Sequence, residues 1–242
     1  MNRRLLPLWL SLSACVEAGQ ARVEVPLFLA GTQLEAPLMT VGDVEVQLDR
    51  ADLAFGPLYL CAGATAGELC DTARLEWLDA AVVDTLAPDA VQVGALTGVS
   101  GPVRSWMYDL GISSQLTRDE PFVLDAAAAL GGASFVVEGR AEVGGAQLSF
   151  RASVPVRQTG DTELGVPVIR KSAAQRFEHE LLAGERGLLL RFDARAWLQG
   201  VDLRPYAGQT EVTLAPDSEA YRSLRNALFV SGRPLFEWDF VP

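Results

Sequence analysis

Few residues of this chain combine the types and spacing that catalysis needs. His179 is the only histidine, and it lies in the segment FEHELLAG. The segment begins like the HExxH helix of zinc proteases, but Ala183 stands where the second histidine ligand must be. A Ser-His-Asp triad requires the same histidine, and the sequence contains no G-x-S-x-G elbow. We therefore interpret His179 as a solvated surface residue and infer no catalysis from it.

Two carboxylates beside a tryptophan form a second candidate. Asp193 and Asp202 flank Trp197 in FDARAWLQGVDL. Paired carboxylates hydrolyse glycosidic bonds, and a tryptophan platform often holds the sugar beside them, so a carbohydrate-active enzyme is one alternative. The other interpretation is a strand with a solvated Asp193 and a buried Trp197.

Aromatic residues form a third candidate, a recognition surface. SWMYDLG places Trp106 and Tyr108 on one face of an expected strand. Tryptophan and tyrosine are favoured at interfaces, so Trp106, Tyr108 and Trp197 are candidates for a recognition surface, with core packing as the alternative. The sequence has neither a G-x-G-x-x-G nor a P-loop nor a D-x-D-x-D-G loop, and no cofactor and no metal site are predicted.

Cys61 and Cys70 bracket the short loop LCAGATAGELC. In an exported protein such a pair is expected to form a disulfide. The alternative is a pair of thiolate metal ligands, but no histidine lies nearby in the sequence.

The N-terminus has the layout of an export signal. Arg3 and Arg4 precede a ten-residue apolar stretch, Leu5 to Ala14, which is too short to span a membrane as a helix. Its end, Leu12-Ser13-Ala14-Cys15, resembles the lipobox of bacterial lipoproteins. The resemblance implies cleavage before Cys15 and attachment of diacylglycerol and further fatty acyl chains, such as palmitate, to that residue. Multiple chains anchor a protein stably to a membrane.

This resemblance defines the expected organisation of the chain. Residues 1–14 are a lipoprotein signal peptide, 15–22 a lipidated tether, and 23–242 a single domain. The expected location is the cell envelope facing the periplasm, and the outer membrane is preferred over the inner because Val16 follows Cys15. The partners are the membrane, through the anchor, and an envelope protein. The net charge of −11 argues against nucleic acid.

Period-two patterns dominate the remaining chain. In residues 133–156, Gly144-Gly145 predicts a two-residue hairpin turn whose register pairs Gly139 with Phe150 and Glu138 with Arg151. Further strands are predicted at 22–30, 43–61 with a break near Gly56-Pro57, 187–197 and 209–216, and short helices at 72–86, 172–184 and 216–232. The pattern predicts a mainly β fold, an antiparallel β-sandwich, immunoglobulin-like or related, with a few short helices.

Two diffuse resemblances follow from this layout. DVEVQLDRADLAFGPLYLC and FDARAWLQGVDL resemble segments of uncharacterised lipoproteins from myxobacteria-like, high-GC bacteria. The layout is also similar to β-sandwich copper-binding proteins of the periplasm that work with a haem peroxidase. Copper prefers imidazole, thiolate or thioether, which leaves His179, Met39 and Met107 as donors. We expect a lipid-anchored binding or structural module, with copper binding and carbohydrate chemistry as alternatives.

Overall fold

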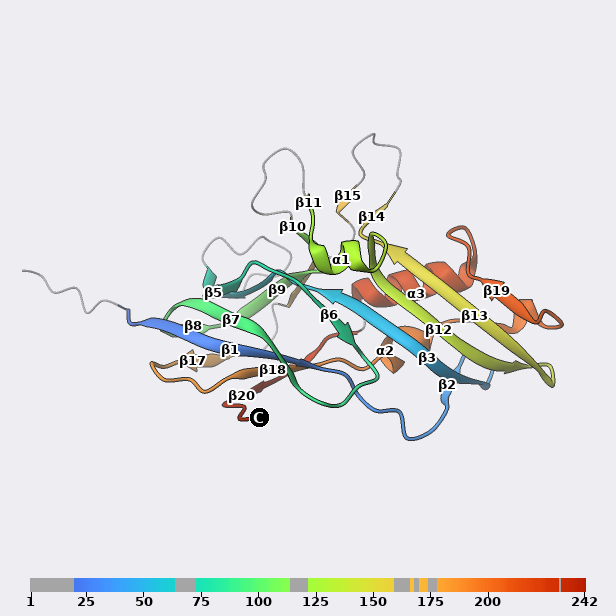
Figure 1. Ribbon diagram of the computed structural model, residues 1–242, viewed down its shortest axis with the longest axis horizontal. Coiled ribbons are helices and arrows are strands. Elements are labelled where there is room, and N and C mark those ends of the chain that lie inside the picture. The colour runs from blue at the N-terminus through green and yellow to red at the C-terminus, as the bar shows by residue number, and fades with distance from the viewer. Residues whose placement is uncertain are drawn as a thin grey trace, which may run out of the picture.

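A computed structural model describes residues 20–63, 73–113, 122–158, 166–167, 170–173, 178–230 and 232–242 of the chain. Within these ranges the protein is mainly β, as predicted, and the body is elongated (Figure 1). None of the helices in these ranges is both long enough and apolar enough to cross a membrane. Cys15 and Cys70 lie outside the described residues, so lipidation and the disulfide with Cys61 stay predictions.

Two large sheets face one another across the main core. The eight-stranded sheet has the order β16 (Arg170–Ala173), β9 (Ser105–Asp109), β4 (Leu58–Cys61), β5 (Ala73–Trp77), β7 (Val91–Val99), β1 (Arg22–Ala30), β18 (Leu188–Arg191), β20 (Leu235–Trp238). The six-stranded sheet has the order β19 (Glu211–Thr213), β13 (Ala146–Pro155), β12 (Ala133–Val143), β3 (Val44–Phe55), β2 (Leu38–Thr40), and β6 (Ala81–Asp84) also pairs with β3. Most pairs are antiparallel, but β1–β18 and β13–β19 are parallel.

Shorter elements complete the fold. Three two-stranded ribbons are formed by β10 (Ile112–Ser113) with β11 (Phe122–Val123), β14 (Arg157–Gln158) with β15 (Val166–Pro167), and β8 (Gly101–Val103) with β17 (His179–Leu181). The described helices are α1 (Asp125–Ala129), α2 (Arg195–Leu198), α3 (Glu219–Val230) and the 3-10 turn η1 (Arg204–Tyr206).

The hairpin β12–β13 has the register that the sequence predicts. Gly139 faces Phe150 and Glu138 faces Arg151, with Gly144-Gly145 as the turn. The two glycines adopt φ of 62° and 78°, which suits a two-residue hairpin turn. The sequence therefore determined which side chains of this hairpin point to the core.

Two predicted helices are wrong. The described part of residues 72–86 contains β5 and β6, and that of 172–184 contains residues of β16 and β17. β5 is hydrogen-bonded between β4 and β7, and β6 joins β3, so ladder pairing overrides the helical spacing of the leucines. The third predicted helix, 216–232, is confirmed as α3.

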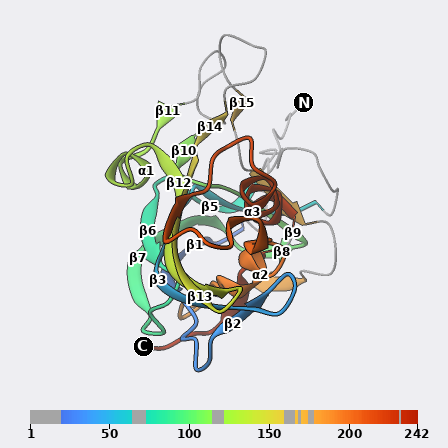
Figure 2. The same cartoon turned by 90° about the vertical axis from the view of Figure 1, so that its right-hand side faces the viewer.

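Helices α2 and α3 fill the concave side of the six-stranded sheet (Figure 2). Trp197 of α2 packs edge-on against Phe135 of β12, with ring centroids 5.0 Å apart. Tyr221 and Leu224 of α3 are buried in the same core. The opposite face of this sheet carries exposed and half-buried polar side chains.

Candidate functional site

The outer side of the six-stranded sheet forms a continuous polar surface. Alternation along each strand sends the apolar side chains to the core and the polar ones outward. We call the following outward residues of β3, β12, β13 and β19 the polar face: Gln47, Asp49, Arg50, Glu138, Arg140, Glu142, Gln147, Ser149, Arg151, Glu211 and Thr213.

Ion pairs organise the centre of the polar face. Arg140 donates from Nε to Asp49 Oδ2 at 3.1 Å and from Nη2 to Asp49 Oδ1 at 2.7 Å. These hydrogen bonds raise the pKa of the Arg140 guanidinium and keep it charged. Arg50 binds Asp52 at 2.6 Å and Glu138 at 3.4 Å. Arg140 is therefore paired with a carboxylate of the neighbouring strand, and Arg50 with one carboxylate of its own strand and one of the neighbouring strand.

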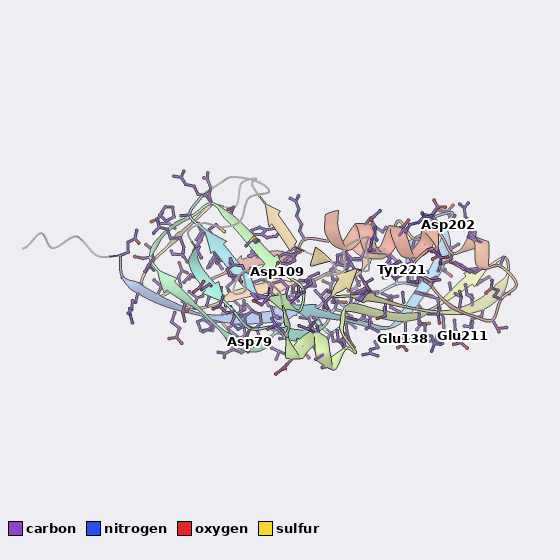
Figure 3. All side chains as sticks on the ribbon, turned by 90° about the horizontal axis from the view of Figure 1, so that it is seen from above. Asp79, Asp109, Glu138, Asp202, Glu211 and Tyr221 are labelled. Atoms are coloured by element: carbon purple, nitrogen blue, oxygen red, sulfur yellow. The ribbon has the colours of Figure 1, made fainter. Side chains whose placement is uncertain are left out.

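The predicted cross-strand pair Glu138–Arg151 is in register, but its side chains have other partners. Arg151 Nε donates to Thr213 Oγ1 of β19 at 2.7 Å, and its Nη2 lies 3.9 Å from Glu211 Oε1. Glu138 accepts from Arg50 instead. Figure 3 shows Glu138 and Glu211 near each other, and both line one shallow hollow of about 200 Å³.

Three further hollows adjoin this surface and share lining residues. One, of about 420 Å³, lies over β3 and β12 and includes Gln47, Arg140 and Pro37. A second, of about 410 Å³, and a third, of about 570 Å³, follow the loop 31–37 that joins β1 to β2, and both include Glu35. Neighbouring hollows share lining residues from α2 past loop 31–37 and across the sheet to β19, and we call this row of four hollows the groove.

The carboxylates at the loop end of the groove differ from those in its centre. Glu35, Glu45 and Glu142 are exposed, and none has an ion pair or hydrogen bond within the described part of the chain. The amide side chains of Gln33 and Gln47 line the same hollows. The loop end of the groove therefore carries unpaired negative charge. At the centre of the polar face, by contrast, carboxylates and arginines neutralise one another.

The 410 Å³ hollow lies at a gap in the pairing of β3. β2 covers residues 44–46 of β3, and β6 covers residues 52–55, on the side away from β12. Residues 47–50 have no strand on that side in the described ranges. We call this hollow the edge notch; it is lined by Gln33, Leu34, Glu35, Ala36, Pro37, Val46, Gln47, Leu48 and Leu86.

The aromatic residues predicted for recognition lie in the core. Trp106, Tyr108 and Trp197 are 4%, 1% and 2% exposed. The rings of Trp106 and Tyr108 stack with centroids 5.2 Å apart, and burial raises the pKa of the Tyr108 phenol. The two residues share a face, as the sequence predicts, but that face is the interior. They stabilise the fold in this structure and do not form an exposed surface.

Asp193, Asp202 and Trp197 do not form a sugar site. Asp193 binds Arg195 at 2.6 Å and Asp202 binds Arg204 at 2.9 Å, and the latter hydrogen bond lowers the pKa of Asp202. Trp197 lies behind them in the core and offers no exposed platform. Each carboxylate is therefore engaged in a local ion pair.

His179 lies on β17 and not on a helix. Its ring stacks on the indole of Trp238, with centroids 3.8 Å apart and planes 3° from parallel. Its Nε2 lies 2.9 Å from Oε1 of Glu185, whose side chain is 5% exposed. The expectation of a freely solvated histidine is therefore wrong, because the β8–β17 ribbon places the ring half-buried against β20.

The three sequence candidates for copper do not converge. Met39 is exposed on β2, Met107 is buried on β9 and His179 lies on β17. β2 and β17 lie at opposite ends of the body (Figure 1). Within the described ranges, no three residues of the His, Cys, Asp and Glu types are grouped as metal ligands.

The groove was missed at the sequence level because its parts are distant in sequence. Loop 31–37, β3 and β12 meet only after the sheet forms. One local pattern does indicate part of the groove: the alternating polar residues of DVEVQLDR predict a strand with one solvent-exposed face.

Comparisons with known proteins do not assign the chain to a family. No family model and no curated protein matches it. A solved structure, MbnP from Methylosinus trichosporium, is similar over 85% of this chain and 87% of its own, with 14% sequence identity and a TM-score of 0.44. A likeness at this level carries no conclusion about function.

Proposed function

We propose that the chain is a lipid-anchored, non-catalytic binding module of the cell envelope that holds its ligand in the groove of the six-stranded sheet. The observation that carries the binding role is the row of four adjoining hollows, two of which lie over the hydrogen-bonded strands β3, β12 and β13. Rigid strands position binding side chains more precisely than loops do.

The distance between the proposed anchor at Cys15 and the groove supports the binding role. Cys15 lies seven residues before Arg22, which allows a reach of about 25 Å at most. β1 is nine residues long and carries the chain about 30 Å further before loop 31–37 begins. The groove then lies at the end of the body remote from the anchor, where an envelope partner has access to it.

Site-specific cross-linking tests the binding role. A photoreactive amino acid at Gln47, in the groove, is compared with the same amino acid at Gln92, an exposed position on β7 of the other sheet. We expect an adduct of defined mass in intact envelopes for position 47 alone. Equal adducts at both positions, or none at 47, would contradict a groove-centred function.

The anchor has its own test. We expect Cys15→Ser to move the protein from the membrane fraction to the soluble fraction, and mass spectrometry of the wild type to show an acylated N-terminal cysteine. An intact methionine start with an unmodified Cys15 would remove the lipoprotein part of the proposal. The cross-linking result is independent of this outcome.

A further inference from the structure

The edge notch is an interruption in an otherwise complete sheet. Leu38 of β2 faces Val46, and Asp84 of β6 faces Asp52, so β3 is paired at both ends of residues 47–50. These four residues span at most about 13 Å, and the register of β3 against β12 shifts by a bulge between Leu48 and Arg50. The backbone groups of this stretch that face away from β12 have no described strand against them.

The β6 border of the notch and the start of the loop beside it are fixed by hydrogen bonds. Thr85 donates from its backbone N–H at 2.9 Å and from Oγ1 at 2.7 Å to the Ala51 carbonyl, which closes the β6 side. The start of loop 31–37 is held by Gly31 N–H to the Ala87 carbonyl at 2.7 Å and Thr32 N–H to the Thr85 carbonyl at 3.0 Å. The notch is therefore a built feature and not a frayed strand end.

The lining of the notch combines an apolar floor with an acidic rim. Leu48 and Leu86 are half-buried at the margin of the main core, and Leu34 is half-buried above them. Glu35 lies on the rim, and Glu45 is exposed on the adjoining part of β3. The arginines that line the adjoining hollows, Arg140 and Arg195, are already paired with carboxylates, so the unneutralised charge here is negative.

We propose that the edge notch binds an extended basic peptide segment of an envelope partner by adding it as a short strand to β3. An exposed sheet edge binds a peptide through main-chain hydrogen bonds, and pockets for alternate side chains provide specificity. Here an apolar side chain would rest on Leu48 and Leu86, while alternate lysine or arginine side chains reach Glu35 and Glu45. The net charge of −11 attracts such a partner at longer range.

This inference rests on the proposed binding role of the groove and names the class of partner. The probe is a blocked, fluorescently labelled tetrapeptide of alternating lysine and valine, short enough for the gap between β2 and β6, and the full-length chain purified in detergent is titrated into it while fluorescence anisotropy is measured. Two matched peptides carry backbone N-methyl groups on the lysines alone or on the valines alone. Because successive N–H groups of a strand point to opposite edges, only one methylated set blocks pairing with β3.

We expect one N-methylated peptide to bind like the parent and the other to bind about ten-fold more weakly or worse. Equal binding of both methylated peptides, or no binding of the parent, would overturn strand addition. If cross-linking at Gln47 still captured a partner in that case, the groove would keep its proposed function and only the peptide mode would fail.

Substitutions that change the charge test peptide binding at the edge notch in a second way. We expect Glu35→Lys to weaken parent-peptide binding about ten-fold, and Glu76→Lys, on exposed β5 surface, to leave it unchanged. Both positions are exposed, so neither change tests folding. An equal effect of the two substitutions would show that only overall charge matters and would overturn recognition at the notch.

Discussion

The six-stranded and eight-stranded sheets differ in how they are covered. β13 alternates strictly between exposed and buried residues, because one face meets solvent and the other meets α2 and α3. In β4 and β9 every residue is buried. On the eight-stranded sheet, Phe28 and Leu189 form one further cluster and Tyr59, Cys61 and Met107 another, outside the main core.

This difference has a functional consequence. The sheet with a wet face carries the groove, the organised ion pairs and the edge notch. The aromatic core lies between the two sheets and links strands distant in sequence, such as β9 and β20 through Trp106 and Phe236. The proposed binding surface is therefore separate from the packing between the two sheets, and the substitutions below test that packing and the hairpin of the six-stranded sheet.

The largest expected effect is in the aromatic core. Phe55 is fully buried and contacts the rings of Trp77, Tyr108 and Phe192. We expect Phe55→Ala to lower the free energy of unfolding by about 3–5 kcal/mol, since it leaves a cavity where both sheets meet. Urea denaturation measures this loss. The control Leu235→Ala, at a 66% exposed residue, should change it by less than about 0.5 kcal/mol.

A substitution in the hairpin should have a smaller effect. A Cβ atom at Gly139 would lie 2.5 Å from the Gln47 carbonyl oxygen and 3.0 Å from the Phe150 ring. We expect Gly139→Val to destabilise the protein by about 1–3 kcal/mol through overpacking. Gly200→Val, where no atom lies within 4 Å of the new Cβ, is the matched control. Equal stability of both variants would show that β12 and β3 are not packed as described.

The buried phenol of Tyr108 predicts a dependence on alkaline pH. Burial raises its pKa in the folded state above the ordinary value of 10.0, so the unfolded chain loses this proton first as pH rises. The buried phenol therefore contributes fully to the free energy of unfolding below pH 10. Above pH 10 this free energy declines, by about 1 kcal/mol near pH 11. Tyr108→Phe should remove that part of the slope. Identical slopes of the free energy of unfolding in both proteins would argue that the phenol is accessible.

The smallest expected effect is a gain in stability. Gly144 has φ of 62° at the first position of the hairpin turn, a conformation that asparagine tolerates. We expect Gly144→Asn to stabilise the protein by about 0.4–1 kcal/mol, chiefly by restricting the unfolded chain. Gly144→Val should instead destabilise it, because a β-branched side chain disfavours positive φ. Thermal unfolding should give a higher Tm than the wild type for Gly144→Asn and a lower Tm for Gly144→Val.

Local patterns in the sequence were sufficient for several elements that have one face in solvent. They determined the register of β12–β13, the strand β1, the break between β3 and β4, and the helix α3. In each case the chemical nature of neighbouring residues alternates or repeats with the period of the element, because solvent selects one face and the core the other.

Only the tertiary structure decided the rest. Residues 75–86 show a helical spacing of leucines, yet β5 and β6 are strands because their backbone groups pair with β4, β7 and β3. Trp106, Tyr108 and Trp197 were placed inside by helices and strands that close over them, and the groove was assembled from loop 31–37, β3 and β12. These outcomes depend on contacts between residues far apart in the chain, and no local period encodes such contacts.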